Sequence, residues 1–172
     1  MPCDLLVIAA SNGENLKLAD RFAALGRERQ LLSEVLDLTT LSLPLYNPRQ
    51  QADVGMPEGI AALSAQLAAA PRWVICTPEY NGSIPPLLTN TIAWLSVADS
   101  DFRLLFNGRP VAIATHSGGG GYTVLTALRL QLAHLGAHVL GRQLVSNSHR
   151  PAQEESMADL VNRLAQLQPI TL

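Results

Sequence analysis

A short polar segment near the start of the chain has the residue types of an anion-binding loop. Ser11, Asn12, Gly13 and Asn15 follow an apolar run and precede a helical pattern. Hydroxyl and amide groups at a helix start suit phosphate, because about half a positive charge resides there. The same residues are common helix caps, so an ordinary N-cap turn is the alternative. Glu14 counts against an anion unless its carboxylate points away.

A second segment, residues 77–86, reads Thr-Pro-Glu-Tyr-Asn-Gly-Ser-Ile-Pro-Pro. Gly82 and the prolines restrict its backbone, and Tyr80 offers an aromatic surface. We expect such a loop to present peptide N–H groups to a planar ring. A turn that only reverses the chain is the alternative.

A third segment begins at His116 and Ser117 and continues with four glycines, residues 118–121. Glycine permits positive φ and close approach of a ligand to the backbone. Ordering four glycines after a buried strand costs entropy, which favours a use over a merely flexible connection. His116 either contacts the ligand or packs locally.

The elements that must position these segments alternate along the whole chain. Short apolar runs predict strands at 5–9, 33–38, 73–77 and 110–115 and a fifth within 137–145, with helical patterns between them and a long loop at 41–57. This alternation predicts one α/β domain over residues 1–172, with helices on both faces of a five-stranded parallel sheet of order 2-1-3-4-5. The three segments follow the first, third and fourth strands, so they converge at the carboxyl edge of the sheet.

Composition and motifs exclude several classes of protein. The net charge is −2 and basic residues are scattered, so we expect no nucleic-acid partner. Apolar runs are shorter than the ~20 residues of a membrane helix, and two cysteines without a CxxC pair favour a reducing cytoplasm. No P-loop is present, and GxGxxG fails because Thr123 and Val124 stand where its last glycine belongs. We expect no metal site.

Residues 77–85 resemble the central motif of the NADPH-dependent FMN reductases, a family that includes quinone, azo-dye and chromate reductases. Residues 43–46 are similar to the family's loop after the second strand, and residues 107–113 to its fourth strand. The chain departs from the family pattern in its first loop, which is short and lacks an arginine, and at Thr89 and Ala93 of the following helix. The resemblance implies a flavodoxin-like three-layer sandwich and association as a homodimer or homotetramer.

The resemblance also implies FMN as cofactor, with NADPH or NADH as reductant and a quinone, free flavin or azo compound as acceptor. Hydride passes to N5 of the flavin, so no catalytic side chain is required. We hypothesise that an N–H group of residues 81–83 faces N5 and that glycine amides stabilise charge near N1. Tyr46 and Tyr80 are the expected substrate contacts. The FMN-binding residues implied are Ser11, Asn12, Gly13, Asn15, Pro78, Glu79, Tyr80, Asn81, Gly82, Ser83, His116, Ser117, Gly118, Gly119, Gly120 and Gly121.

Two other functions are compatible with the same residues. A flavodoxin-type electron carrier would serve a protein partner and react slowly with NADPH. A flavodoxin-fold module that has lost flavin is conceivable because the first loop is short.

Overall fold

A parallel sheet forms the centre of the protein in the computed structural model, which describes residues 3–170. Its strands are β1 (Leu5–Ala9), β2 (Ser33–Asp37), β3 (Trp73–Cys76), β4 (Pro110–His116), β5 (His138–Val139) and β6 (Leu144–Ser146). The order is β2-β1-β3-β4-β5, and β6 also pairs with β4. The predicted fold class and strand order are therefore confirmed.

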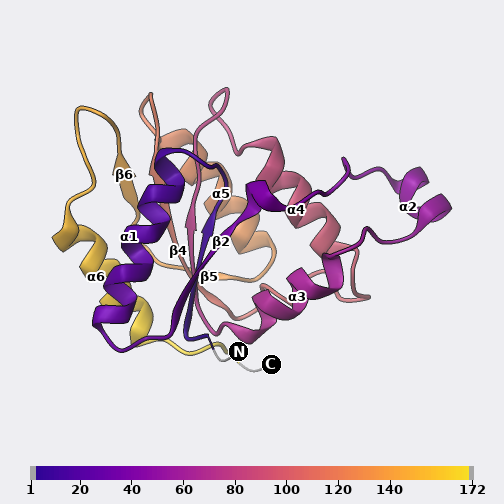
Figure 1. Cartoon of the computed structure of the whole chain (residues 1–172), viewed down its shortest axis with the longest axis horizontal. Helices are drawn as coiled ribbons and strands as arrows, with labels where there is room; N and C mark the ends of the chain where they lie inside the picture. Colours follow the sequence, from indigo (N-terminus) through magenta and orange to yellow (C-terminus); the bar gives the residue numbers. More distant parts are fainter. Residues whose placement is uncertain (1–2, 171–172) are drawn as a thin grey trace.

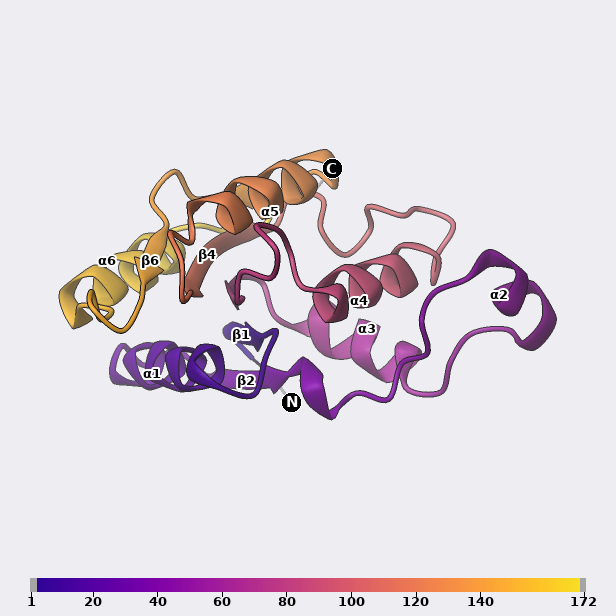
Figure 2. The same cartoon turned by 90° about the horizontal axis from the view of Figure 1, so that it is seen from above.

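Helices cover both faces of the sheet, as Figures 1 and 2 show. The helices α1 (Glu14–Glu28) and α6 (Glu154–Ala165) pack on one face. The helices α3 (Ile60–Ala69), α4 (Pro86–Ser96) and α5 (Tyr122–His134) pack on the other. This three-layer arrangement follows from strands that are apolar on both sides, since each face must be buried. None of the helices in residues 3–170 is both long and apolar enough to cross a membrane.

The structure differs from expectation in the segment after β2. We predicted a continuous loop over 41–57, but the helix α2 (Pro48–Val54) lies within it. A one-turn 3-10 helix, η1 (Leu38–Thr40), precedes this loop and begins at the last residue of the predicted strand 33–38. The side chain of Asn47 caps α2 and Pro48 starts it, a local signal that the loop-rich composition concealed. No residue of α2 is buried. The helix stands away from the rest of the molecule in Figures 1 and 2.

The predicted fifth strand is divided into β5 and β6. Between the two pieces lie four residues, 140–143, whereas two residues of β4 separate their pairing partners. The extra residues form a short loop outside the strands, which includes Gly141. Pairing by β6 then ends opposite His116, at the rim where the glycine loop begins.

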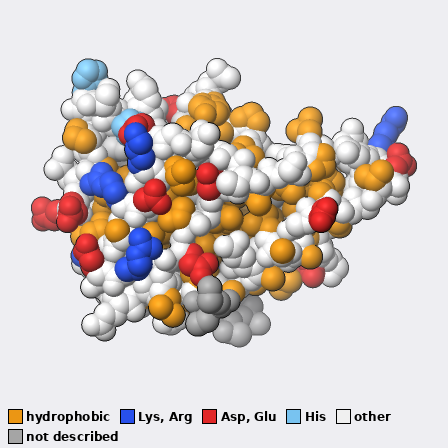
Figure 3. All heavy atoms as spheres, viewed as in Figure 1, with side chains coloured by type: hydrophobic (Ala, Val, Ile, Leu, Met, Phe, Trp, Pro, Cys, Tyr) orange, Lys and Arg blue, Asp and Glu red, His pale blue; other side chains and the backbone are white. Residues whose placement is uncertain are grey.

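Charged side chains are unevenly distributed over the surface. In Figure 3 they gather over α1 and α6, while the face toward α3 and α2 is mainly apolar or uncharged. Exposed apolar residues of the α2 region are Leu45, Val54 and Met56, which are 77%, 73% and 40% exposed. These three apolar side chains are exposed on or beside a helix that projects from the rest of the molecule.

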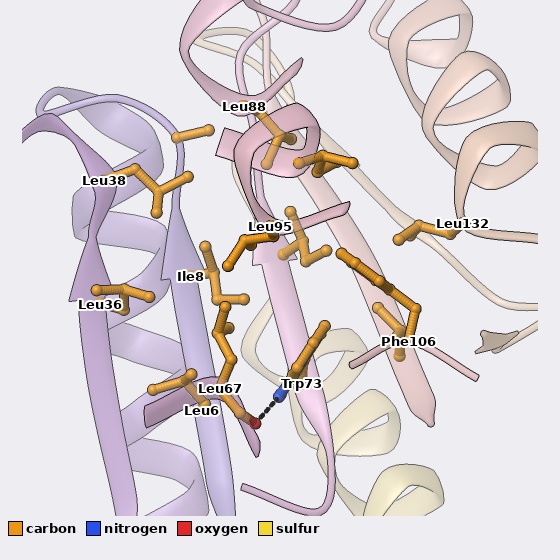
Figure 4. Packing of buried hydrophobic residues seen from close by; sticks show 14 of the residues in the cluster. Leu6, Ile8, Leu36, Leu38, Leu67, Trp73, Leu88, Leu95, Phe106 and Leu132 are labelled. Atoms are coloured by element: carbon orange, nitrogen blue, oxygen red, sulfur yellow. Dashed lines mark hydrogen bonds between the residues drawn. The ribbon is translucent and has the colours of Figure 1, made fainter. Parts of the chain in front are cut away.

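Apolar side chains hold the sheet and the helices in register. In Figure 4, Ile8, Leu36 and Trp73 of three neighbouring strands meet Leu67 and Leu95 from the covering helices. The indole N–H of Trp73 donates to the carbonyl of Leu67 at 3.3 Å, so this large side chain is buried with its polar atom satisfied. The last residues of β1 and β3 are paired, Ala9 with Cys76, and Cys76 pairs with Ala114, after which β4 continues two residues to His116.

Candidate functional site

The three predicted segments follow the carboxyl ends of β1, β3 and β4, which are neighbours in the sheet, so they lie at one rim. The first segment leads into α1 and leaves a row of backbone N–H groups free. Among residues 3–170, no acceptor is found for the N–H groups of residues 11–15. Successive free N–H groups at the start of a 15-residue helix form a concave donor set that suits a phosphate.

Asn15 ties this first segment to the glycine loop. Its side-chain amide donates to the carbonyl of His116 at 2.9 Å, and its oxygen accepts from the amide of His116 at 2.8 Å. Asn15 is buried, and the two partners are 101 residues apart in the chain. The paired bonds fix the start of α1 against the end of β4. His116 therefore contributes its backbone to the framework of the site.

Glu14 does not oppose an anion at this position. Its carboxylate accepts a 2.7 Å hydrogen bond from Lys17, and this bond lowers the pKa of Glu14. The carboxylate is exposed and its charge is balanced by the ammonium group. The free N–H groups of the loop are thus not neutralised by an acidic neighbour.

The segment after β3 forms a two-residue turn. The amide of Tyr80 donates to the carbonyl of Ser83 at 3.1 Å, and the amide of Ser83 donates back at 3.0 Å. Asn81 and Gly82 between them have φ values of +52° and +70°, the geometry in which Asn-Gly is preferred. The amide of Ser83 is used within the turn. Within this turn, the N–H groups that have no acceptor among the described residues are those of Asn81 and Gly82.

The glycine loop is held by a carboxylate from the neighbouring segment. Oε2 of Glu79 accepts from the Ser117 hydroxyl at 2.9 Å and from the Gly121 amide at 2.7 Å. The Gly119 amide donates to the Ser117 hydroxyl at 3.1 Å. Among the described residues, the amides of Gly118 and Gly120 have no acceptor.

Two kinds of glycine are present in this loop. Gly121 has φ +72°, and a Cβ there would lie 2.8 Å from a methyl of Thr115. The backbone conformation and the packing of the protein itself therefore require glycine at this position. A Cβ at Gly118 or Gly120 would meet nothing within 4 Å. These open positions let a flat ligand approach the backbone closely. They fit a ring bordered by N–H donors.

Tyr80 and Tyr46 have different surroundings. Tyr80 is half exposed at the rim. Tyr46 packs edge-on against Trp94 of α4 at 5.0 Å between ring centroids, and its hydroxyl donates to Gln51 at 3.2 Å. Asn90, which our sequence reasoning missed, accepts from the Tyr46 amide at 2.7 Å. A polar side chain in the largely apolar α4 was the available signal.

A second feature that the sequence did not reveal is a cationic groove beside the first segment. Lys17, Arg21, His116 and Ser146 contribute to the lining of a cavity of about 210 Å³ between α1 and the segment after β6, as does Glu14, which pairs with Lys17 and leaves Arg21 as the cation without a carboxylate partner among the described residues. These residues come from three separate elements. Only the fold brings them together next to the free N–H groups.

Cys76 lies at the end of β3 but is not a reactive group. Burial raises the pKa of the Cys76 thiol, so the nucleophilic thiolate is disfavoured. No group of three His, Cys, Asp or Glu side chains that could hold a metal ion is found within residues 3–170.

The donor set matches the polar parts of FMN. The free N–H groups of residues 11–15 fit its phosphate, and the open glycines with the turn at Asn81 and Gly82 fit its ring. The arginine absent from the first segment is replaced by no side chain of that segment. Backbone donors and the start of α1 supply the positive potential instead.

The fold and rim define a flavodoxin-like α/β protein. FerB from Paracoccus denitrificans, described as a flavoenzyme NAD(P)H:(acceptor) oxidoreductase, has a similar structure, with a TM-score of 0.74, 22% identity and 95% of each chain covered. The family model for NADPH-dependent FMN reductase matches residues 3–151. The chain belongs to the NADPH-dependent FMN reductase family.

Relatives with assigned activities are similar over most of the chain. A quinone reductase from Escherichia coli strain K12 is 35% identical over 134 residues, which are 76% of this chain and 66% of that protein. An NAD(P)H-dependent FMN reductase from Pseudomonas aeruginosa is 31% identical over 140 residues, 77% of this chain and 74% of that protein. The chain thus spans about two thirds to three quarters of these relatives.

Proposed function

We propose that the protein is an FMN-dependent NAD(P)H oxidoreductase that reduces a small acceptor such as a quinone, a free flavin or an azo compound. The observation that carries this proposal is the meeting of free N–H groups at residues 11–15 with the open glycine loop at one rim. Relatives named quinone reductase, NADPH azoreductase and FMN reductase support the activity.

Each segment has a distinct task in this proposal. Bound FMN supplies the hydride and electron transfer. The start of α1 holds the phosphate, while Asn81 and Gly82 direct their N–H groups at the ring edge near N5. The amides of Gly118 and Gly120 donate toward N1 and the neighbouring carbonyl, where charge develops on reduction. Tyr80 and Tyr46 line the side from which nicotinamide and acceptor approach.

The test is the visible spectrum of the purified protein with FMN, before and after anaerobic addition of NADPH or NADH. We expect a bound flavin spectrum that bleaches rapidly with the nicotinamide and returns when a quinone is added. Slow bleaching with a stable bound spectrum would instead support a flavodoxin-type carrier. If calorimetry detects no heat when FMN is added, the protein would instead be a flavodoxin-fold module that has lost flavin.

We also propose that the protein is a cytoplasmic homodimer or homotetramer. The seven-residue α2 has no buried residue, and helices this short are not stable alone in water. The exposed side chains of Leu45, Val54 and Met56 give a second copy an apolar surface to cover. The free, buried cysteines Cys3 and Cys76 suit a reducing compartment.

A further inference from the structure

The carboxylate of Glu79 forms hydrogen bonds with the glycine loop, residues 117–121, in addition to lying in the segment after β3. A carboxylate only accepts hydrogen bonds, so the hydroxyl of Ser117 must donate to Oε2 of Glu79. That direction leaves an oxygen lone pair of Ser117 for the amide of Gly119. With the bond from Gly121, one carboxylate oxygen anchors three positions of the glycine loop.

The same carboxylate lies at the start of α5. Gly121 is the N-cap of this 13-residue helix, and its amide donates directly to Glu79. The positive end of the helix dipole attracts an anion at this position. Within residues 3–170, Glu79 forms no ion pair with a lysine, arginine or histidine. The positive potential that α5 would direct at the rim is therefore offset by a full negative charge.

We propose that Glu79 is a positioning residue that also sets the reduction potential of bound FMN. The inference rests on the proposed function. Its hydrogen bonds hold the glycine loop ready for the ring, and its charge disfavours the negative charge that the ring gains on reduction. The protein consequently binds reduced FMN less tightly than the glycine amides alone would, and the flavin is a stronger reductant.

Glu79→Gln separates the two effects, because it keeps the shape and the accepting oxygen but removes the charge. The reduction potential of the FMN-loaded protein is measured by anaerobic equilibration with a reference dye, and the Kd for oxidised FMN by fluorescence. We expect a Kd within about threefold of the wild type. The ratio of affinities for reduced and oxidised FMN should rise about tenfold, which raises the potential by ~30 mV for a two-electron couple.

Glu28→Gln is the matched control, since it removes one exposed carboxylate from the last residue of α1, at the end of this 15-residue helix that lies away from the rim. Its potential should equal that of the wild type. Ser117→Ala tests the hydrogen bonds without changing the charge. It should weaken binding of oxidised and reduced FMN equally, by about tenfold, and leave the potential unchanged.

Equal potentials for Glu79→Gln and the wild type would overturn the role of the charge. Unchanged FMN affinity in Ser117→Ala would overturn the role of the anchored loop. Both outcomes leave the proposed function intact, because the wild type still binds FMN. A wild-type protein that binds no FMN would instead overturn the proposed function and this inference with it.

Discussion

The double hydrogen bond between Asn15 and the backbone of His116 makes a quantitative prediction. Asn15→Ala removes both bonds and leaves the N–H and C=O of His116 without partners. An unsatisfied buried group costs about 1–3 kcal/mol, and His116 is only partly buried, so the sum is about 2–4 kcal/mol. The better helix propensity of alanine returns about 0.5 kcal/mol. We therefore expect a net loss of ~2–3 kcal/mol.

Urea unfolding of the FMN-free protein measures this loss. With a slope of about 2 kcal/mol/M, the unfolding midpoint should fall by about 1–1.5 M. Asn12→Ala is the matched control, because Asn12 is exposed and its side chain makes no hydrogen bond within residues 3–170. It should change stability by less than about 0.5 kcal/mol. If Asn15→Ala is as stable as Asn12→Ala, the two bonds do not hold the rim together.

Asn15→Asp tests the donor separately. Its carboxylate still accepts from the amide of His116, but it has no N–H for the carbonyl and repels that oxygen. At pH 7 this variant should be at least as unstable as Asn15→Ala. Protonation supplies a donor again, so its deficit relative to the wild type should shrink as the pH falls toward 4. A deficit that is constant with pH would refute the assigned direction of the bond.

Four further predictions concern other residues. Gly121→Ala should lower the free energy of unfolding by about 2–4 kcal/mol, because φ is +72° and a Cβ would lie 2.8 Å from a methyl of β4. Gly120→Leu should leave urea unfolding unchanged, because a Cβ there meets nothing within 4 Å, but it should raise the FMN Kd at least tenfold. Tight FMN binding by this variant would contradict close approach of the ring. The hydrogen bond from Arg163 lowers the pKa of Asp159, so the stabilisation by this ion pair is complete above the unfolded pKa of about 4 and is lost as the pH falls. Asp159→Asn should therefore show a smaller difference in unfolding free energy between pH 7 and pH 3 than the wild type. An equal difference would refute the contribution of the pair. Val54→Glu should convert the proposed oligomer to monomer in sedimentation velocity, because it places a charge on the exposed apolar surface of α2. A monomeric wild type would contradict the proposed interface.

The general plan of the protein could be predicted from local patterns. Apolar runs such as residues 73–76 predict buried parallel strands, and their alternation with helices places the loops after the first, third and fourth strands at one edge. The turn at Asn81 and Gly82 was equally readable, because positive φ is a property of those residue types. These features depend on neighbours in sequence or on the period of the pattern.

Other features escaped prediction because they depend on a few residues that local composition outweighs. Asn47 and Pro48 start α2 inside a stretch that reads as a loop. The fifth strand is divided because four of its residues lie opposite two residues of β4. This mismatch can be recognised only when the pairing with β4 is known. Neither the helix cap at Asn47 nor the unequal number of residues between the paired positions changes the hydrophobic periodicity of the sequence.

Local patterns alone predicted that the loops after the first, third and fourth strands meet at one edge of the sheet. Only the tertiary structure decided how the segments are joined, because Asn15 meets His116 across 101 residues and Glu79 meets Gly121 across 42. Those hydrogen bonds require the register of β1, β3 and β4 to be correct within a residue. Side-chain packing across the sheet sets that register, and no local pattern contains it.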